Sequence, residues 1–212
     1  MKLLEKASTK TRLKMKTKLK IKRKNRIFFL LVLFFILGFL IAAFFYYKPS
    51  IIFPKTQVTS ENAEFVPIVD RNYYDIVSKE IQNSQQSIDI AMFEFKFYEN
   101  ENNKVRHLLE DLIDAHERGV KIRVLLDESD WSPSIGKDNK KTIDYLIENG
   151  IQAKLDNPKK TLHVKLLIID DSIIIGSTNL GFHALERNNE ASILITNSEI
   201  TEYYKTYFET LW

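Results

Sequence analysis

Residues 27–47, which read IFFLLVLFFILGFLIAAFFYY, contain no charged residue and only one glycine. At 1.5 Å per residue, a helix over this run rises about 30 Å, the thickness of the hydrocarbon core of a bilayer. A cleaved signal peptide has a shorter apolar stretch that ends in small residues, whereas Ala42 and Ala43 are followed here by more aromatic residues. A core helix would show polar residues at helical spacing. The run therefore predicts an uncleaved transmembrane anchor.

The residues that precede the run predict its orientation. Residues 1–26 hold twelve of the 31 Lys and Arg residues and one of the 28 acidic residues, Glu5. Basic residues beside a transmembrane helix stay on the cytoplasmic side, so this arm is expected to be cytoplasmic and residues 48–212 extracytoplasmic. A nucleic-acid-binding tail is the other interpretation. Beside an anchor, contact with anionic lipid headgroups, worth about 1 kcal/mol per basic residue, is favoured.

The rest of the chain is acidic. Without residues 1–26, 19 basic and 27 acidic residues remain, a formal charge of −8. Such a domain repels a bulk polyanion, so any phosphate that it binds must be held locally. The chain contains no Cys, which excludes disulfides and thiolate metal ligands.

The pattern after the anchor predicts one α/β domain. Residues 48–64 contain two prolines and a polar second half, which is typical of a linker. Residues 65–212 alternate β-rich runs with helical patterns, which predicts a mixed, largely parallel sheet flanked by helices. Gly119 and Gly150 follow two helical runs, where a left-handed C-terminal residue is favoured. Strands are predicted near 65–69, 87–95, 120–126, 151–155, 163–169, 172–176 and 190–195, and helices near 71–84, 102–118, 138–149 and 198–211.

The stretch TLHVKLLIIDDSIIIGSTN, residues 161–179, places one histidine and one lysine in an otherwise apolar run. Side chains alternate along a strand, so His163 and Lys165 project from one side and can meet the same phosphate. Asp170 falls on the opposite face, at the start of a DDS sequence that is typical of a turn. We therefore expect Asp170 to hold the turn of a hairpin and not to touch substrate.

Polar residues also follow the second arm of this hairpin. Gly176 lets the backbone leave the sheet, and Ser177 and Asn179 bring a hydroxyl and an amide beside Lys165. Together they predict a phosphate-binding site that needs no metal and no other cofactor. Glu190 opens the next apolar run, where its carboxylate is expected to accept a hydrogen bond from the histidine ring and fix its tautomer.

His163, Lys165 and Asp170 stand as H-x-K-x4-D, followed by G-S-x-N. This pattern resembles the signature of the phospholipase D superfamily, and the spacing to Glu190 is similar to that of its single-motif members, the bacterial periplasmic endonucleases and the mitochondrial cardiolipin hydrolases. The resemblance covers residues 65–212. It implies a phospholipase D-like domain with His163, Lys165, Asp170 and Glu190 as its catalytic set.

The resemblance also implies a mechanism. One histidine attacks phosphorus, a second histidine protonates the leaving oxygen, and water then releases the product. Because the chain has a single H-x-K, the active unit is expected to be a homodimer. Two departures from the relatives are visible: the chain has no Cys for the zinc element of the animal hydrolases, and the exported endonucleases lack an anchor of this kind.

Phospholipid is the expected substrate, because the anchor holds the site near the bilayer and the domain is acidic. A nuclease acting on DNA or RNA is the alternative, with Lys159, Lys160 and Lys165 forming a local basic groove. A catalytically inactive membrane-bound binding protein is the alternative from another class.

The remaining polar residues have ordinary interpretations. His107, His116 and His183 are expected to be surface or packing residues, and DESD at 127–130 is expected to be a solvated loop. AMFEFKFY at 91–98 is expected to be a strand whose end lines the pocket.

Overall fold

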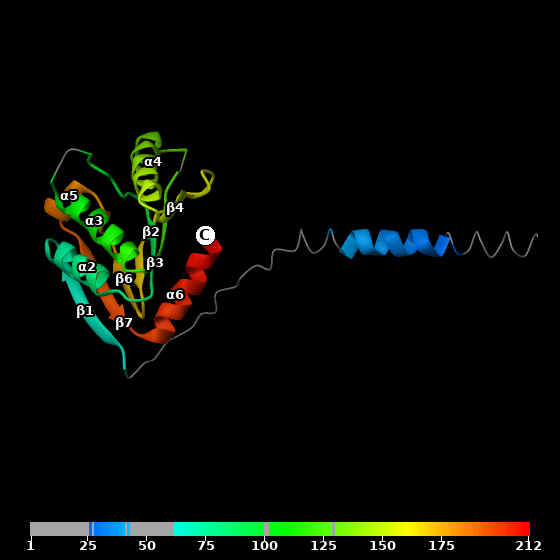
Figure 1. Ribbon diagram of the computed structural model, residues 1–212, viewed down its shortest axis with the longest axis horizontal. Coiled ribbons are helices and arrows are strands. Elements are labelled where there is room, and N and C mark those ends of the chain that lie inside the picture. The colour runs from blue at the N-terminus through cyan, green and yellow to red at the C-terminus, as the bar shows by residue number, and fades with distance from the viewer. Residues whose placement is uncertain (1–25, 27, 41, 43–61, 100–101, 129) are drawn as a thin grey trace, which may run out of the picture. The chain divides into compact units, whose positions relative to one another are not determined.

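The computed structural model describes residues 26, 28–40, 42, 62–99, 102–128 and 130–212, which belong to two units, residues 1–54 and 55–212 (Figure 1). In the first unit, residues 28–40 are helical and their side chains are exposed. Among the described residues, no helix combines the length and the apolar character needed to cross a membrane. The predicted anchor at 27–47, the basic arm and the linker all extend outside the described residues, so they stay predictions.

The second unit alternates strands and helices. In chain order these are β1 (Glu64–Val69), α2 (Asn72–Asn83), β2 (Ser87–Met92), α3 (Lys104–Glu117), β3 (Lys121–Leu126), α4 (Pro133–Glu148), β4 (Gln152–Leu155), β5 (Lys165–Ile169), β6 (Ser172–Gly176), α5 (Phe182–Glu186), β7 (Ala191–Thr196) and α6 (Ser198–Leu211). The strands form one sheet in the order β1-β7-β6-β5-β2-β3-β4, so the H-x-K hairpin of β5 and β6 lies in its centre.

The sheet is mixed, as predicted, but the prediction that it is largely parallel is wrong. β2 pairs in parallel with β3, and β3 with β4, across the helices α3 and α4. The pairs β1–β7, β7–β6, β6–β5 and β5–β2 are antiparallel. Parallel neighbours need a connection of helical length, which the two-residue turn between β5 and β6 does not provide. The hairpin follows from the sequence, whereas the docking of β5 against β2 depends on tertiary contacts.

Several boundaries also differ from the predicted ones. β2 ends at Met92, because the chain beyond it bonds to side chains of α4 instead of continuing the ladder. β5 begins at Lys165, so His163 lies in the segment before the strand. α4 begins at Pro133, about one turn earlier than predicted, since proline is favoured in the first turn of a helix. The short helix α5 was absent from the sequence pattern.

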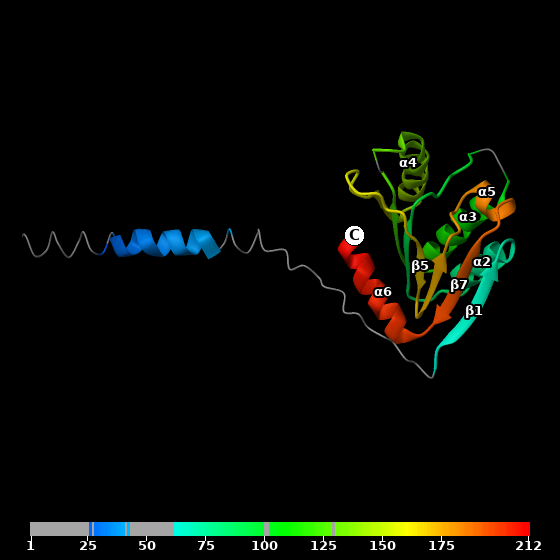
Figure 2. The same ribbon diagram turned by 180° about the vertical axis from the view of Figure 1, so that it is seen from behind.

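Alternation along the strands gives the sheet two apolar faces. Residues of α2, α3 and α4 pack in the core on one face, and residues of α6 pack on the other (Figures 1 and 2). Leu167 and Ile169 of β5 belong to the first core, and Leu166 and Ile168 belong to the second. Because β5 is buried on both faces, the positions of the residues at its two ends are firmly set.

The second core leaves the β1 edge of the sheet uncovered. Phe65 and Val69 on β1 are each 55% exposed. Phe65 pairs with Ile195 of β7, and paired residues of antiparallel strands share a face. Ile195 packs against the second core, so this face continues that core outward to the surface. We call Phe65, Val69 and Ile195 the β1–β7 face.

Candidate active site

The predicted histidine and lysine lie at the start of β5. Lys165 is its first residue and pairs with Met92 of β2. His163 lies two residues earlier, and the intervening Val164 carbonyl accepts a hydrogen bond from the Phe93 amide at 2.9 Å. His163 is exposed, whereas Lys165 is only 8% exposed. This one short segment therefore presents an open imidazole beside a largely buried ammonium.

Phe93 brings the two side chains together. Its ring centroid lies 4.8 Å from that of His163, in an edge-to-face arrangement. The Lys165 Nζ lies 4.8 Å from the same centroid and donates a hydrogen bond to the His163 carbonyl at 3.2 Å. Within the described residues Lys165 forms no ion pair, and no hydrogen bond engages the ring of His163. Both groups are therefore free to bind an anion, and they lie together as strand alternation predicts.

Burial sets the electrostatics of the lysine. Desolvation lowers the pKa of Lys165 below its ordinary value of 10.5, and the carboxylates of Glu190, Asp127 and Glu94 partly oppose this effect. Among the described ion pairs, none joins these three acids to the ammonium. A partly desolvated cation of this kind attracts phosphoryl oxygens more strongly than a fully hydrated one.

The G-S-x-N segment leaves the sheet at a close approach between β6 and β7. A Cβ on Gly176 would lie 2.4 Å from the Ala191 carbonyl oxygen, which only glycine avoids. The loop then runs beside residues 94–96, where the Leu180 amide donates to the Glu94 carbonyl at 3.0 Å. Asn179 lies in this loop, and its buried Oδ1 has no hydrogen-bond partner. The unpaired atom is a buried acceptor, which cannot bind a phosphoryl oxygen, so the phosphate contact of Asn179 stays a prediction.

Ser177 and Glu190 bind each other. The Ser177 hydroxyl donates to the Glu190 carboxylate and accepts from the Ala191 amide at 3.1 Å. The second carboxylate oxygen of Glu190 accepts from Asn188 Nδ2 at 3.1 Å. Within the described part of the chain, no hydrogen bond joins Glu190 to His163. In a single chain both side chains hold the start of β7, so the phosphate contact of Ser177 and the tautomer role of Glu190 stay predictions.

Asp170 lies at the opposite end of β5. Its carboxylate accepts three backbone hydrogen bonds, from the amides of Gln85, Gln86 and Ser87, at 2.8, 2.9 and 2.9 Å. Its φ of 49° is in the left-handed region, which aspartate tolerates better than most residues. Five residues of strand separate it from Lys165, a distance of roughly 16 Å. Asp170 therefore holds the turn as predicted, and its place in the catalytic set stays a prediction.

Asp127 is a site residue that the sequence pattern did not reveal. We predicted a solvated loop at 127–130, but Asp127 is fully buried and accepts a hydrogen bond from the Leu162 amide at 2.7 Å. The bond ties the end of β3 to the segment that carries His163. Asn139 of α4, also fully buried, donates to the carbonyls of Asp127 and Phe93, each at 2.9 Å. Burial of polar residues within a charged stretch is a tertiary property, which local composition does not indicate.

Trp131 is a second residue that was missed. Its ring stacks on Phe93 with a centroid separation of 6.0 Å and an interplanar angle of 10°. Its Nε1 donates to Thr161 Oγ1 at 2.7 Å, yet the residue remains 65% exposed. The one signal in the sequence is that Trp131 follows the predicted strand at 120–126, because binding residues often lie after strand ends in α/β sheets.

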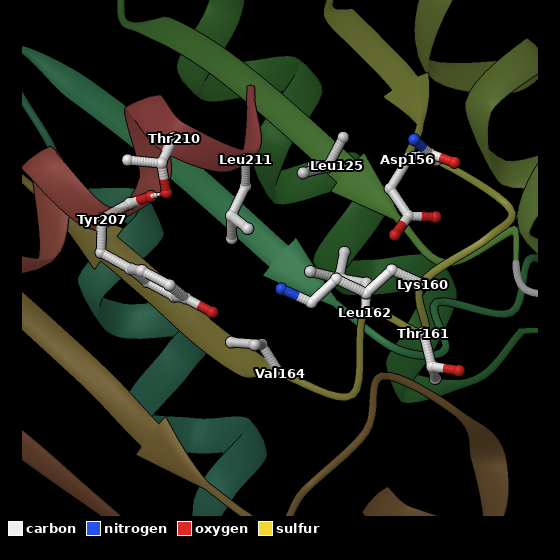
Figure 3. Close-up of a pocket in the computed structure, with 10 residues that line it drawn as sticks. Leu125, Asp156, Lys160, Thr161, Leu162, Val164, Tyr207, Thr210 and Leu211 are labelled. Atoms are coloured by element: carbon white, nitrogen blue, oxygen red, sulfur yellow. Dashed lines mark hydrogen bonds between the residues drawn. The ribbon is translucent and has the colours of Figure 1, made fainter. Parts of the chain in front are cut away.

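A pocket of about 210 Å³ lies between residues 156–164 and the end of α6. Figure 3 shows the side chains of Leu125, Leu211 and Val164 around it, with the Lys160 side chain reaching across. Burial raises the pKa of Asp156 at its rim, although the Glu128 amide opposes this. Neither His163 nor Lys165 lines the pocket, so it is not the place where they would hold a phosphate.

A family model described as a cardiolipin synthase, PLD-like domain, matches residues 77–212, which is more than half of the chain. The chain belongs to the phospholipase D superfamily. Three similar proteins of this superfamily illustrate its breadth. The 5'-3' exonuclease PLD3 of Xenopus laevis is 29% identical over 173 residues, covering 75% of this chain and 33% of the exonuclease. The mitochondrial cardiolipin hydrolase of Mus musculus is 31% identical over 98 residues, covering 46% of this chain and 42% of the hydrolase.

The third is a solved structure. Nuc from Salmonella typhimurium, a phospholipase D family member, superposes with a TM-score of 0.59 at 21% identity, covering 70% of this chain and 95% of Nuc. This likeness shows the fold. The chain spans about a third of the exonuclease and less than half of the hydrolase. The histidine and the lysine of the superfamily motif, His163 and Lys165, lie side by side in this fold.

The other histidines have different surroundings. His107 bonds to Asn102 and Tyr74, the His116 ring lies against Gly150, and His183 packs edge-to-face on Phe182. Within the described residues, no group of three or more metal-ligating side chains is arranged around a common point. Among the described residues, the phospholipase D motif thus offers an exposed imidazole and a largely buried ammonium side by side.

Proposed function

We propose that the chain hydrolyses phosphodiester bonds through a phosphohistidine on His163. The observation that carries the proposal is the exposed His163 imidazole beside the unpaired, largely buried Lys165. A ring nitrogen attacks phosphorus, the P–N bond forms and the bond to the leaving oxygen breaks. The leaving oxygen takes a proton from a second histidine. Water then attacks phosphorus, gives its proton to that histidine and breaks the P–N bond. Lys165 and Asn179 stabilise the charge on the phosphoryl oxygens.

The second histidine is proposed to be His163 of another copy of the chain. These 212 residues hold one H-x-K, and in a homodimer the second copy would supply the second histidine. The β1–β7 face supports this proposal, because its exposed Phe65 and Val69 continue an apolar core and Val69 pairs with Ala191, next to Glu190 at the site end of the sheet. Two chains anchored in one membrane through residues 27–47 would meet at high effective concentration, with residues 48–212 outside the cytoplasm.

Co-expression tests the shared site. We expect equal amounts of wild-type and His163→Ala chains to leave about one quarter of the full activity, because random pairing leaves about one quarter of the dimers with two histidines. The assay is hydrolysis of bis(p-nitrophenyl) phosphate by the full chain in detergent with EDTA. Co-expression with His107→Ala should leave full activity. Activity that falls only by half would mean that each chain works alone and would contradict the shared site.

The lysine predicts a specific dependence on pH. Phosphate binding needs the protonated amine, and burial lowers the pKa of Lys165, so binding is fully present at low pH and is lost as pH rises through that lowered pKa. We expect the alkaline limb of kcat/KM for bis(p-nitrophenyl) phosphate to lie below pH 10.5. In Lys165→Arg the limb should move to higher pH, because guanidinium keeps its proton. Identical alkaline limbs in the two proteins would assign the limb to another group.

Two substrate classes follow from different observations. Phospholipid is supported by the predicted anchor and by the similarity to mitochondrial cardiolipin hydrolase. Nucleic acid is supported by the similarity to the 5'-3' exonuclease and by aromatic and basic side chains around the site. An inactive binding protein would leave bis(p-nitrophenyl) phosphate intact. The generic assay therefore tests the chemistry separately from the choice of substrate.

A further inference from the structure

Trp131 is an exposed residue near His163 and Lys165, and contacts with Phe93 and Thr161 hold its ring in place. Phe93 supports one face of the Trp131 ring, at 6.0 Å between centroids and 10° between planes. Thr161 fixes the edge by accepting the Nε1 hydrogen at 2.7 Å. The indole has no unpaired polar atom, yet 65% of the residue is exposed. A large aromatic surface fixed in this way but left open to solvent is suited to stacking with a ligand.

Phe93 connects this surface directly to the reacting groups. The ring that supports Trp131 also contacts His163, at 4.8 Å between centroids, and lies 4.8 Å from Lys165 Nζ. Because Phe93 contacts both rings, the distance between the Trp131 and His163 rings cannot exceed the Phe93–Trp131 and Phe93–His163 separations added together. A group stacked on Trp131 would therefore lie on the same part of the surface as the phosphate that His163 attacks.

Hydrogen bonds hold the residues of this arrangement in place. The Phe93 carbonyl accepts a hydrogen bond from the buried Asn139 side chain, and its amide donates to Val164. Trp131 lies directly before α4, and the Asp130 amide donates to the Pro158 carbonyl at 3.3 Å. Both aromatic rings are thus fixed by the elements that also fix His163. A preordered surface loses little conformational entropy when a ligand binds.

The charges around this surface favour a particular kind of polyanion. Lys159 is exposed in the loop that leads to Thr161, whereas Lys160 reaches across the pocket beside α6, so Lys159 is the cation that this loop offers near the aromatic surface. The chain beyond residue 26 carries a formal charge of −8, which opposes a long electrostatic contact with a duplex. Local cations combined with an exposed aromatic ring are typical of single-strand binding, where each unpaired base can stack. In a duplex the bases are already stacked and cannot reach Trp131.

We propose that Phe93 and Trp131 form a stacking platform for an unpaired nucleobase beside the scissile phosphate, so that the substrate is single-stranded nucleic acid. This inference rests on the proposed phosphodiesterase function and names the substrate of that same site. The base lies on the open face of Trp131, its phosphate lies between His163 and Lys165, and the neighbouring phosphate faces Lys159.

Cleavage of labelled oligonucleotides by the full chain in detergent, with EDTA, tests the platform. The test variants are Trp131→Ala and Trp131→Phe. The control variant is Ile147→Ala, which also removes an exposed apolar side chain, on helix α4. We expect Trp131→Ala to raise KM for a single-stranded oligonucleotide about tenfold or more, because one base stacks on one ring. Trp131→Phe should restore most of the loss, and Ile147→Ala should behave as wild type.

An abasic oligonucleotide separates stacking from a general structural effect. On this substrate, Trp131→Ala and wild type should have the same KM, because there is no base to stack. An equal loss on normal and abasic strands would overturn the inference, and so would an unchanged KM on the normal strand. Headgroup release from anionic phospholipid vesicles that falls in Trp131→Ala, with oligonucleotide cleavage unchanged, would make Trp131 a lipid contact and would also overturn it. Failure of the wild type on bis(p-nitrophenyl) phosphate would instead refute the proposed function itself.

Discussion

Replacement of His163 by alanine is expected to lower kcat for phosphodiester hydrolysis by at least roughly a thousandfold, because the nucleophile of the first step is lost. The free energy of unfolding should change by less than about 0.5 kcal/mol, since the side chain is exposed. Hydrolysis of bis(p-nitrophenyl) phosphate and a thermal melt of the same preparation measure both quantities. His107→Ala is the matched histidine control. His107 lies in α3 and bonds to Asn102 and Tyr74, so its loss should leave kcat unchanged.

The covalent step can be observed directly. A substrate labelled at phosphorus should transfer its label to the wild-type chain and not to His163→Ala, and the P–N bond should survive alkali and break in acid. Label on a residue other than His163, or full activity in the alanine variant with an unchanged melt, would refute a phosphohistidine at this position. The two measurements are independent, because one follows the product and the other follows the enzyme.

The parts of this site that the sequence predicts are those set by local geometry. Residues two apart on an extended chain share a side, which places His163 beside Lys165 whatever the rest of the fold does. Two acids between apolar runs predict a turn, and Asp170 holds that turn in the structure. Gly176 follows the same logic, because the chain must leave the sheet where β6 and β7 approach closely.

The parts that the sequence does not predict depend on contacts between distant segments. Asn139 and Phe93 are 46 residues apart, and their hydrogen bond ends β2 where the apolar pattern would continue it. Asp127 stands in a stretch of charges that indicates a solvated loop, yet the Leu162 amide comes to it from 35 residues away. The order of strands has the same origin: alternating strands and helices favour a parallel sheet, whereas the docking of β5 beside β2 and of β1 beside β7 adds antiparallel pairs.

The largest effect on stability is expected at Asp170. Asp170→Ala removes an acceptor that binds three backbone amides and places alanine at a φ of 49°. Hydrogen bonds to charged groups contribute about 1.5–3 kcal/mol each, and water can replace those to the two exposed amides, so we expect a loss of roughly 2–4 kcal/mol. In a domain of this size that lowers Tm by roughly 5–15 °C. Asp170→Asn keeps one acceptor oxygen and tolerates the left-handed conformation, so its loss should be smaller.

Comparison of stability and kcat in variants of Asp170 and of its neighbour Asp171 shows whether the motif aspartate takes part in the reaction. Asp171 lies on the same turn and its side chain is exposed, so Asp171→Ala removes a neighbouring carboxylate without removing the three hydrogen bonds. It should melt close to wild type. Well below its Tm, Asp170→Ala should keep most of the wild-type kcat per folded chain, because the carboxylate lies at the far end of β5 from Lys165. A kcat that collapses while the melt stays unchanged would mean that Asp170 takes part in the reaction. Loss of stability with retained kcat would mean that one aspartate of the motif serves the fold while the histidine and lysine serve the chemistry.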